Sequence, residues 1–236
     1  MVTRRMLNVS VIIPAYNEEA SILKVLEAVQ RQQTPECRYE VIVVDDGSRD
    51  RTVEIARSRP DLYSQLILQP RNGGKGAAVK AGLAMATGEY VLIQDADLEY
   101  DPVDYPVLRR PLEKGPTDLV MGSRLIAPPM TRVSYFWHKV GNRLITLLFN
   151  IIYNTTFTDI YCGYIMYRRA LLDPAELKTE GWEQHAEMLA RLVMRADHIY
   201  EVPVSYYGRT YAEGKKIRAL DVLPVLFEIV RRRFVR

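Results

Sequence analysis

Three acidic residues stand at alternate positions, Asp95, Asp97 and Glu99, directly after a predicted strand at residues 90–94. Side chains at alternate positions of an extended segment point the same way, so the three carboxylates can share one face. Crowded carboxylates repel one another unless a cation joins them. Their hard oxygen atoms suit Mg²⁺ or Mn²⁺, and Mg²⁺ typically sits between one or two carboxylates and a diphosphate. The pattern predicts a divalent-metal site, with a solvated acidic loop as the alternative.

A glycine-rich segment, Arg71-Asn72-Gly73-Gly74-Lys75-Gly76, precedes a predicted helix at residues 75–86. Glycines expose backbone N–H groups and a helix start favours anions, so the segment resembles a phosphate loop and makes Lys75 a candidate substrate-binding residue. It lacks the glycine spacing of a P-loop and the Ser or Thr after the lysine, and Val79 breaks the GxGxxG pattern. These departures argue against an ATPase or a classical dehydrogenase. The alternative is a tight turn with close helix packing.

Two further sets of polar residues are less informative when taken alone. Residues 45–52 read Asp-Asp-Gly-Ser-Arg-Asp-Arg-Thr, which on its own is typical of a turn and a helix cap. The three histidines, His138, His185 and His198, are scattered and form neither a metal-ligand nor a triad pattern. We interpret them as incidental.

The elements that must position these residues alternate between strands and helices in the first half of the chain. Short alternating elements predict a mostly parallel sheet with right-handed crossovers, flanked by helices, and ligands bind such sheets at the carboxyl ends of the strands. Tyr16, Asp45, Asp46, Asp95 and Asp97 all follow a predicted strand directly. The predicted strands are residues 9–14, 41–44, 65–68, 90–94 and 119–121, and the predicted helices are 18–33, 52–59 and 75–86.

The second half is richer in helices. Residues 133–153, 182–195 and 221–233 have helical apolar spacing, residues 199–204 suit a short strand, and residues 206–216 suit a polar loop. No repeat, low-complexity tract or linker divides the chain, so we expect one α/β domain over residues 1–236.

Composition narrows the function classes. Lysine and arginine number 32 against 29 acidic residues, a net charge of +3 that is too mild to indicate nucleic-acid binding. Two cysteines give no disulfide framework, which favours reduced thiols in the cytoplasm. The longest apolar stretch, residues 144–153, is about half the length of a membrane span. We expect a cytoplasmic protein that does not cross a membrane.

Four motifs together resemble the inverting family 2 glycosyltransferases in order and spacing, over about the first 125 residues. They are Val11-Ile12-Ile13-Pro14-Ala15-Tyr16-Asn17-Glu18-Glu19, Val43-Val44-Asp45-Asp46-Gly47-Ser48, Asn72-Gly73-Gly74-Lys75-Gly76 and Asp95-Ala96-Asp97. The resemblance implies the nucleotide-sugar-binding α/β fold called GT-A. Residues 1–125 would form the nucleotide-sugar half and residues 126–236 the acceptor half.

The resemblance also implies roles for individual residues. Asp46 would contact the nucleotide base, Asp95 the ribose or base side, and Asp97 would ligate the metal that bridges the diphosphate. The residues expected to line the base pocket are Pro14, Tyr16 and Glu18.

The second half resembles dolichyl-phosphate mannose synthases and related polyprenyl-phosphate glycosyltransferases. The motifs are Gly122-Ser123-Arg124, Gly141-Asn142-Arg143, Asn154-Thr155-Thr156 with Thr158-Asp159, and the segment from Glu201 to Tyr211. In that subgroup Glu99 would help hold the metal, Arg124 and Arg209 would contact diphosphate or acceptor phosphate, and Lys215 would assist. One departure is Cys162-Gly163-Tyr164-Ile165, where many relatives carry a Thr-x-Tyr-Lys-like stretch.

The sequence therefore predicts transfer of a hexose, mannose or glucose, from GDP-mannose or UDP-glucose to polyprenyl phosphate. An anionic lipid phosphate needs no strong general base, and Arg124, Arg132 or Arg143 would position it. Two alternatives stay open. One is a saccharide hydroxyl acceptor, for which Asp159 or Glu187 would serve as base, and the other is nucleotide-sugar binding without transfer.

Membrane contact is a related expectation. Residues 133–153 and 220–236 pair apolar faces with arginines, which suits peripheral binding to the cytoplasmic face of a membrane. The alternative is that both helices pack on the core or in a dimer.

Overall fold

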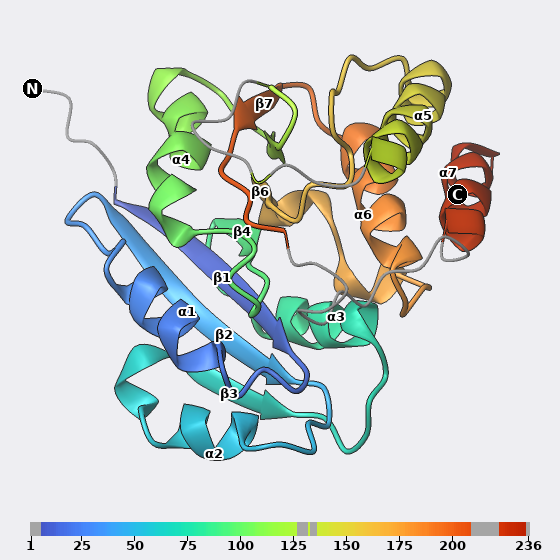
Figure 1. Cartoon of the computed structure of the whole chain (residues 1–236). Coiled ribbons are helices and arrows are strands. Elements are labelled where there is room, and N and C mark those ends of the chain that lie inside the picture. Colours follow the sequence, from blue (N-terminus) through green and yellow to red (C-terminus); the bar gives the residue numbers. More distant parts are fainter. Residues whose placement is uncertain (1–5, 127–131, 133–135, 209–221, 235–236) are drawn as a thin grey trace, which may run out of the picture.

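A seven-stranded sheet forms the centre of the molecule in the computed structural model, which describes residues 6–126, 132, 136–208 and 222–234 (Figure 1). Its strand order is β3-β2-β1-β4-β6-β5-β7. The strands are β1 (Leu7–Ala15), β2 (Cys37–Asp45), β3 (Gln65–Leu68), β4 (Tyr90–Ile93), β5 (Leu119–Ser123), β6 (Ile165–Arg168) and β7 (Ile199–Pro203).

The pairing confirms the prediction of a mostly parallel sheet. Strands β1 to β4 are mutually parallel where they pair, and β5 is parallel to β7. Strand β6, which the sequence analysis did not predict, runs antiparallel between β4 and β5. Its four residues are too few for a reliable periodic signal, and its place depends on pairing with strands distant in sequence.

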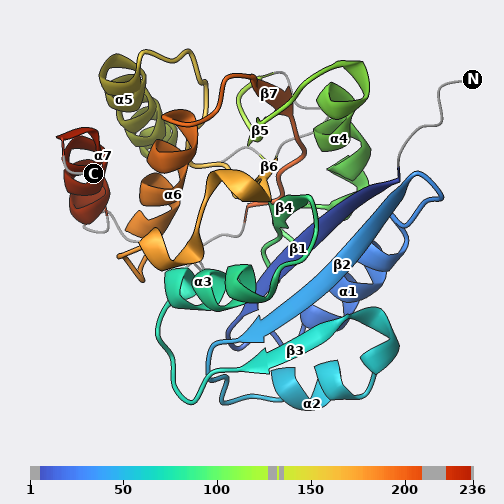
Figure 2. The same ribbon diagram turned by 180° about the vertical axis from the view of Figure 1, so that it is seen from behind.

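Helices cover both faces of the sheet (Figures 1 and 2). One face carries α1 (Ile22–Gln30), α2 (Thr52–Arg57) and α4 (Tyr105–Lys114), and the other carries α3 (Lys75–Met85), α5 (Phe136–Tyr153), α6 (Glu183–Val193) and α7 (Val222–Phe234). Successive side chains of a strand point to opposite faces. Accordingly Ile12 packs in the core with α3 and α6, whereas Val11 and Ile13 pack in the core with α1 and α4.

The predicted helices are confirmed with shifted ends, and α4 was missed. The first helix begins at Ile22 instead of residue 18, because Asn17 has a positive φ of 53° and residues 19–21 form a turn. Prolines at the start and inside α4 obscured its helical pattern. Of the polar loop predicted at residues 206–216, residues 209–216 lie outside the described residues.

One close contact explains why α3 contains so many small residues. A Cβ added at Gly82 would lie 2.4 Å from a methyl carbon of Ile12 on β1. The helix therefore lies directly on the sheet, and its first residue, Lys75, is held at the sheet edge where β1, β2 and β4 end.

Candidate active site

A cavity of about 380 Å³ opens at the carboxyl ends of β1, β2 and β4. Its volume falls within the roughly 300–1,000 Å³ that is usual for small-molecule sites. The eight predicted residues of the first half all line it: Pro14, Tyr16, Glu18, Asp46, Lys75, Asp95, Asp97 and Glu99. An inner cavity of about 100 Å³ shares part of this lining, including Lys75, Asp97 and Trp182. The structure thus brings these residues together, while their individual roles stay predictions.

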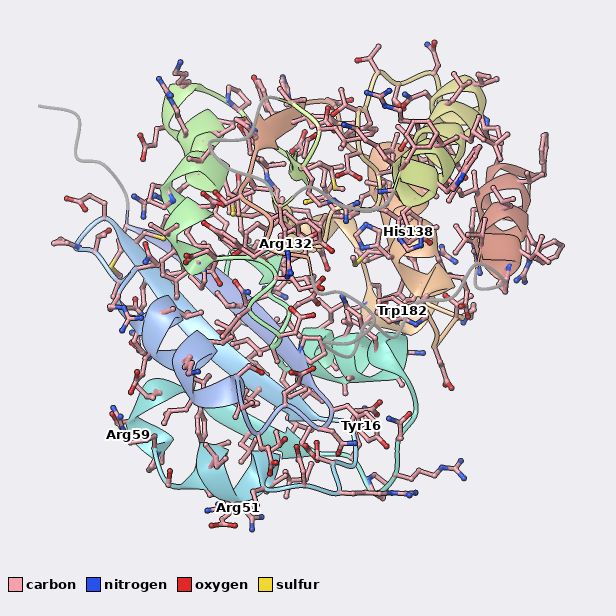
Figure 3. The ribbon with its side chains drawn as sticks, viewed as in Figure 1. Tyr16, Arg51, Arg59, Arg132, His138 and Trp182 are labelled. Carbon is pink, nitrogen blue, oxygen red and sulfur yellow. The ribbon has the colours of Figure 1, made fainter. Side chains whose placement is uncertain are left out.

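Two loops at the mouth of the outer cavity hold each other in place. The backbone N–H groups of Asn17 and Glu18 donate to the hydroxyls of Ser48 and Thr52, at 2.9 and 2.8 Å. In return, the Asn17 side chain accepts from the backbone N–H of Arg49 at 2.8 Å. The polar residues after β2 therefore form a turn whose hydrogen bonds stabilise the loop after β1. That loop carries Tyr16, which lines the outer cavity (Figure 3).

Asp46 and the glycine-rich loop form one structure. The Asp46 carboxylate accepts hydrogen bonds from the backbone N–H groups of Gly73 and Gly74, both at 2.9 Å. Burial raises the pKa of Asp46 above its usual value, although these two donors oppose the shift. The N–H groups that made the loop resemble a phosphate cradle are thus already bound by the protein.

Close packing accounts for the glycines themselves. Gly74 has a φ of +95°, and a Cβ on Gly74 or Gly76 would lie within 2.8 Å of the carbonyl oxygen of Glu180. The structure thus supports the alternative of a tight turn with close helix packing for this loop.

Lys75 stands between an acid and an aromatic ring. Its ammonium group forms an ion pair with Asp95 and lies 5.4 Å from the ring centroid of Trp182. Such a cation over an indole is attracted by the ring. Trp182 precedes α6 and borders both cavities (Figure 3). Lys75 therefore fixes the position of an aromatic wall as well as adding charge.

The predicted metal ligands, Asp97 and Glu99, line both cavities. The expected extended geometry is wrong, because β4 ends at Ile93 and Leu98 has a φ of 62°. The segment is a turn, in which Asp97 accepts from the backbone N–H of Glu99 at 3.0 Å. Glu99 also accepts from the Tyr206 hydroxyl at 2.9 Å.

These residues fit a divalent ion only together with a ligand that supplies more oxygen atoms. Among the described residues, no group of three or more His, Cys, Asp or Glu side chains could hold a metal. Mg²⁺ is commonly bound by one or two carboxylates, phosphate oxygens and water. Asp97 and Glu99 beside an open cavity provide the protein part of such a set.

Arg124, which the sequence suggests as a phosphate contact, is bound to other side chains of the protein. Its Nε and Nη2 donate to the buried carboxylate of Asp159 at 2.7 and 2.8 Å, and its guanidinium lies 5.0 Å from the Tyr206 ring. Burial would raise the pKa of Asp159, but the charge and hydrogen bonds of Arg124 outweigh it and hold the pKa below its usual value. Arg124 still lines the inner cavity.

Glu187, the other carboxylate considered as a base, is buried in an ion-pair cluster. It pairs with Arg191 at 3.2 Å and with Arg232 of α7 at 2.8 Å, and it accepts from backbone N–H groups at Lys178 and Thr179. Burial would raise its pKa, but the bonds from Thr179 and Lys178 and the charge of Arg232 lower it. It does not line either cavity. Asp159 and Glu187, the two carboxylates considered as general bases for a hydroxyl acceptor, are therefore both bound to arginines. This argues against a hydroxyl acceptor.

The remaining predicted cations lie elsewhere. Arg143 is exposed on α5 and lines neither cavity, so the structure does not bring it to the site. Arg132 is exposed, and its backbone N–H donates to the carbonyl of Tyr206 at 3.2 Å. Arg209 and Lys215 lie outside the described residues.

Several residues that border the site were not predicted as site residues, among them Gly163, Trp182, His185 and Tyr206. A Cβ on Gly163 would lie 2.8 Å from an Asp95 carboxylate oxygen, so only glycine fits beside that acid. The Cys-Gly-Tyr departure was the one sequence signal for it. His185 and Trp182 come from the start of α6, about ninety residues after Asp95 in sequence, and no local pattern placed them there.

Curated proteins similar to this chain transfer sugars, according to their names. It is 29% identical over 238 residues to a dolichyl-phosphate beta-glucosyltransferase of Trichomonas vaginalis, covering 94% of this chain and 72% of that protein. It is 31% identical over 230 residues to an undecaprenyl-phosphate 4-deoxy-4-formamido-L-arabinose transferase of Pseudomonas paraeruginosa, covering 94% and 64%. It is 30% identical over 201 residues to a low-salt glycan biosynthesis hexosyltransferase of Haloferax volcanii, of which it spans about half (48%).

Solved structures share the fold. Glucosyl-3-phosphoglycerate synthase from Mycobacterium tuberculosis, crystallised with Mn²⁺, uridine diphosphate and phosphoglyceric acid, superposes with a TM-score of 0.72 at 23% identity. The match covers 98% of this chain and 80% of that one. The sheet and its flanking helices therefore form a GT-A fold. In addition, the sequence model described as "Glycosyl transferase family 2" matches residues 10–174, well over half of the chain. The chain belongs to glycosyl transferase family 2.

Proposed function

We propose that this protein transfers a hexose from a nucleotide-sugar to a polyprenyl phosphate. The observation that carries the proposal is the cavity at the sheet edge, whose walls bear Asp97 and Glu99 beside Asp46 and Tyr16. Two of the relatives are named for transfer to dolichyl or undecaprenyl phosphate, which supports this acceptor class.

On the donor side, the nucleotide would occupy the outer cavity, with its base near Pro14, Tyr16 and Glu18. Each carboxylate oxygen of Asp46 accepts one glycine N–H and has a second lone pair, through which Asp46 would contact the base. The donor is a GDP- or UDP-sugar carrying mannose or glucose. UDP-glucose is the first to test, because one relative is named a glucosyltransferase and the solved neighbours hold uridine diphosphate.

Asp97 and Glu99 would hold Mg²⁺ or Mn²⁺ together with the diphosphate. When bound, this ion supplies positive charge that stabilises the leaving diphosphate. The chain's own residues prepare the site around it. Tyr206 fixes Glu99 by a hydrogen bond, and the turn at Leu98 presents both carboxylates to the cavity. Arg209, and Lys215 further along the same segment after Tyr206, are proposed to contact phosphate.

On the acceptor side, both candidate bases are held in ion pairs, which favours a phosphate as the nucleophile. A hydroxyl acceptor needs a base to remove its proton, whereas a lipid phosphate is already anionic near neutral pH. Asp159 is held by Arg124 and Glu187 by Arg191 and Arg232, so each carboxylate already stabilises a cation. Arg124, at the wall of the inner cavity, is proposed to keep that region positive enough for an incoming phosphate.

A surface formed by α5 and α7 is proposed to rest on the membrane that holds such a lipid. The two helices lie side by side at one end of the molecule, joined by a 2.9 Å bond from the Tyr153 hydroxyl to the Ile229 carbonyl (Figures 1 and 2). Their exposed apolar residues are Phe136, Trp137, Leu144, Leu147, Ile151, Leu223, Phe227, Val230 and Phe234.

The charges on this surface suit anionic lipid. Lys139, Arg143 and Arg233 are exposed, α5 contains no acidic residue, and the one acid of α7, Glu228, is buried. Within the described residues, no helix is long and apolar enough to cross a membrane. An interfacial position accounts for both the apolar and the basic side chains.

The test is a donor panel of GDP-mannose, UDP-glucose and related sugars, assayed with Mg²⁺ or Mn²⁺, with and without polyprenyl phosphate. We expect release of nucleoside diphosphate, and sugar appearing in the lipid phase, only when the metal and the lipid phosphate are both present. Equal turnover with a soluble saccharide would replace the proposed acceptor by a hydroxyl. No release with any donor and acceptor would leave a nucleotide-sugar-binding protein.

A further inference from the structure

His185 lies on α6, where its side chain lines the inner cavity with Lys75, Asp97 and Arg124. The sequence pattern gave this histidine no role. In the structure it is the described histidine that reaches the candidate site, because His138 is exposed on α5 and His198 pairs with Asp118 at the start of β7. Its chemistry at that position can be worked out from its contacts.

The hydrogen bond of His185 determines which ring nitrogen carries a proton. Nε2 lies 2.9 Å from the carbonyl oxygen of Ile160. A carbonyl oxygen can only accept, so Nε2 must be the donor, and in the neutral ring Nδ1 then carries a lone pair. Burial, and next the charge of Lys75, lower the pKa of His185 to about 4, so the ring is neutral near pH 7. Within the described residues, Nδ1 has no hydrogen-bond partner.

A neutral ring with a lone pair selects the kind of group that it can bind. The ring itself does not attract a phosphate, because its lone pair repels phosphate oxygens. A hydroxyl group, which donates its hydrogen, fits the lone pair.

The position of the inner cavity indicates which hydroxyl that is. Asp97 and Glu99, the proposed ligands of the ion at the diphosphate, line both cavities and so mark the boundary between them. In a nucleotide-sugar the sugar follows the diphosphate. If the nucleotide fills the outer cavity, the sugar enters the inner one, where His185 lies.

We infer that Nδ1 of His185 accepts a hydrogen bond from a hydroxyl of the transferred sugar, and so helps determine which sugar is used. This inference rests on the proposed function. The ring is held ready for that role, because the bond to Ile160 and the contact with the Tyr161 ring, 5.5 Å between centroids, fix its orientation. An acceptor held in place in advance loses less entropy on binding.

Two substitutions distinguish the role of Nδ1 from that of Nε2. A glutamine amide reaches about as far as Nε2, so His185→Gln keeps the donor to Ile160 and removes the acceptor at Nδ1. An asparagine amide lies near the Nδ1 position, so His185→Asn keeps an acceptor there and loses the bond to Ile160. Both variants are compared with the wild type by kcat/KM for the active donor and for its monodeoxy analogues.

In the wild type, we expect one monodeoxy donor to lose on the order of 10- to 100-fold in kcat/KM, because the acceptor is then left unpaired. In His185→Gln, kcat/KM for the parent donor should fall by a similar factor. Removing the donor hydroxyl as well should lower kcat/KM little further, because that hydroxyl and Nδ1 act as a pair. His185→Asn should retain a preference for the hydroxyl.

Three results would overturn the inference. The first is full kcat/KM of His185→Gln with the parent donor, and the second is an unchanged set of monodeoxy penalties in that variant. The third needs no variant and is a wild type that tolerates every monodeoxy donor. A wild type without any sugar transfer would instead refute the proposed function, and melting temperatures of both variants identify a loss that is due to misfolding.

Discussion

Arg124 and Asp159 form a two-pronged ion pair, with Nε 2.7 Å from Oδ2 and Nη2 2.8 Å from Oδ1. The Asp159 side chain is fully buried, and its Oδ2 also accepts from the backbone N–H of Arg124 at 3.1 Å. This arrangement ties the end of β5 to the loop after α5. It makes Asp159 a positioning residue for the cation that lines the inner cavity.

Asp159→Ala should therefore lower the free energy of unfolding by about 3 kcal/mol, because it leaves the largely buried charge of Arg124 without its partner. Chemical denaturation would measure the change. The control is Glu54→Ala, which removes the partner of Arg51 in an ion pair that is about two-thirds exposed (Figure 3), and should lower the free energy of unfolding far less. Equal effects of the two substitutions would contradict a structural role for Asp159.

Asp97→Ala should abolish turnover while the fold stays intact. Its side chain is partly exposed at the cavity, and removing it deprives the diphosphate site of a proposed metal ligand. We expect nucleoside diphosphate release to fall by about 10³-fold or more, with a melting temperature close to that of the wild type. Glu113→Ala, on the exposed side of α4, is the matched control and should be fully active. An active Asp97→Ala enzyme would remove the metal from the proposed mechanism.

Most of the sheet, and the edge that carries the site, could be predicted from the sequence. Short apolar runs bounded by turn residues, such as Val41–Val44, are typical of buried strands. Polar residues directly after parallel strands meet at the carboxyl edge of the sheet. For that reason the sequence predicts Asp46, Asp95 and Asp97 at one edge of the sheet, and all three line the outer cavity there.

The contacts made across the chain could not be predicted, because they depend on residues far apart in sequence. Asp46 binds the N–H groups of Gly73 and Gly74, which a local pattern presents as free for phosphate. Strand β6 is held by pairing with β4 and β5, which are both distant from it in sequence. Trp182 reaches the site only because α6 packs against α3.

Trp182→Ala should weaken donor binding. The indole borders both cavities and lies 5.4 Å from the Lys75 ammonium, so its loss removes an apolar wall and leaves Lys75 less constrained. We expect the KM for the donor to rise about 10-fold or more, and Trp182→Phe to recover part of the loss. The other tryptophan supplies the control, since Trp137→Ala on the exposed face of α5 should leave the donor KM unchanged. A normal KM in Trp182→Ala would exclude Trp182 from the donor site.

Substitutions on the α5–α7 surface should weaken membrane binding without changing the fold. Trp137 and Phe227 are 77% and 66% exposed, so replacing both by serine removes apolar area that nothing in the described structure covers. Binding to vesicles of phosphatidylglycerol and phosphatidylcholine should fall by about 10-fold or more, as measured by sedimentation. Leu68→Ser and Val103→Ser, on exposed residues elsewhere, are the controls. Unchanged vesicle binding would contradict a lipid-binding role for this surface. A wild-type dimer that dissociates in the variant would instead make the surface a subunit interface.

His185 should make stability depend on pH in a defined window. Its pKa is about 4 in the folded protein against an ordinary 6.5, so between these values the unfolded chain binds the proton more readily. Stability is therefore highest above pH 6.5 and falls as the pH drops toward 4, by about 2 kcal/mol at about pH 5 for this group alone. Urea denaturation of the wild type and of His185→Gln at about pH 8 and pH 5 isolates the contribution, because glutamine does not titrate. The wild type should lose about 2 kcal/mol more than the variant over this range. Parallel losses would mean that the histidine ring is already charged, or freely solvated, in the folded protein, and Nδ1 would then no longer be the acceptor proposed for the sugar.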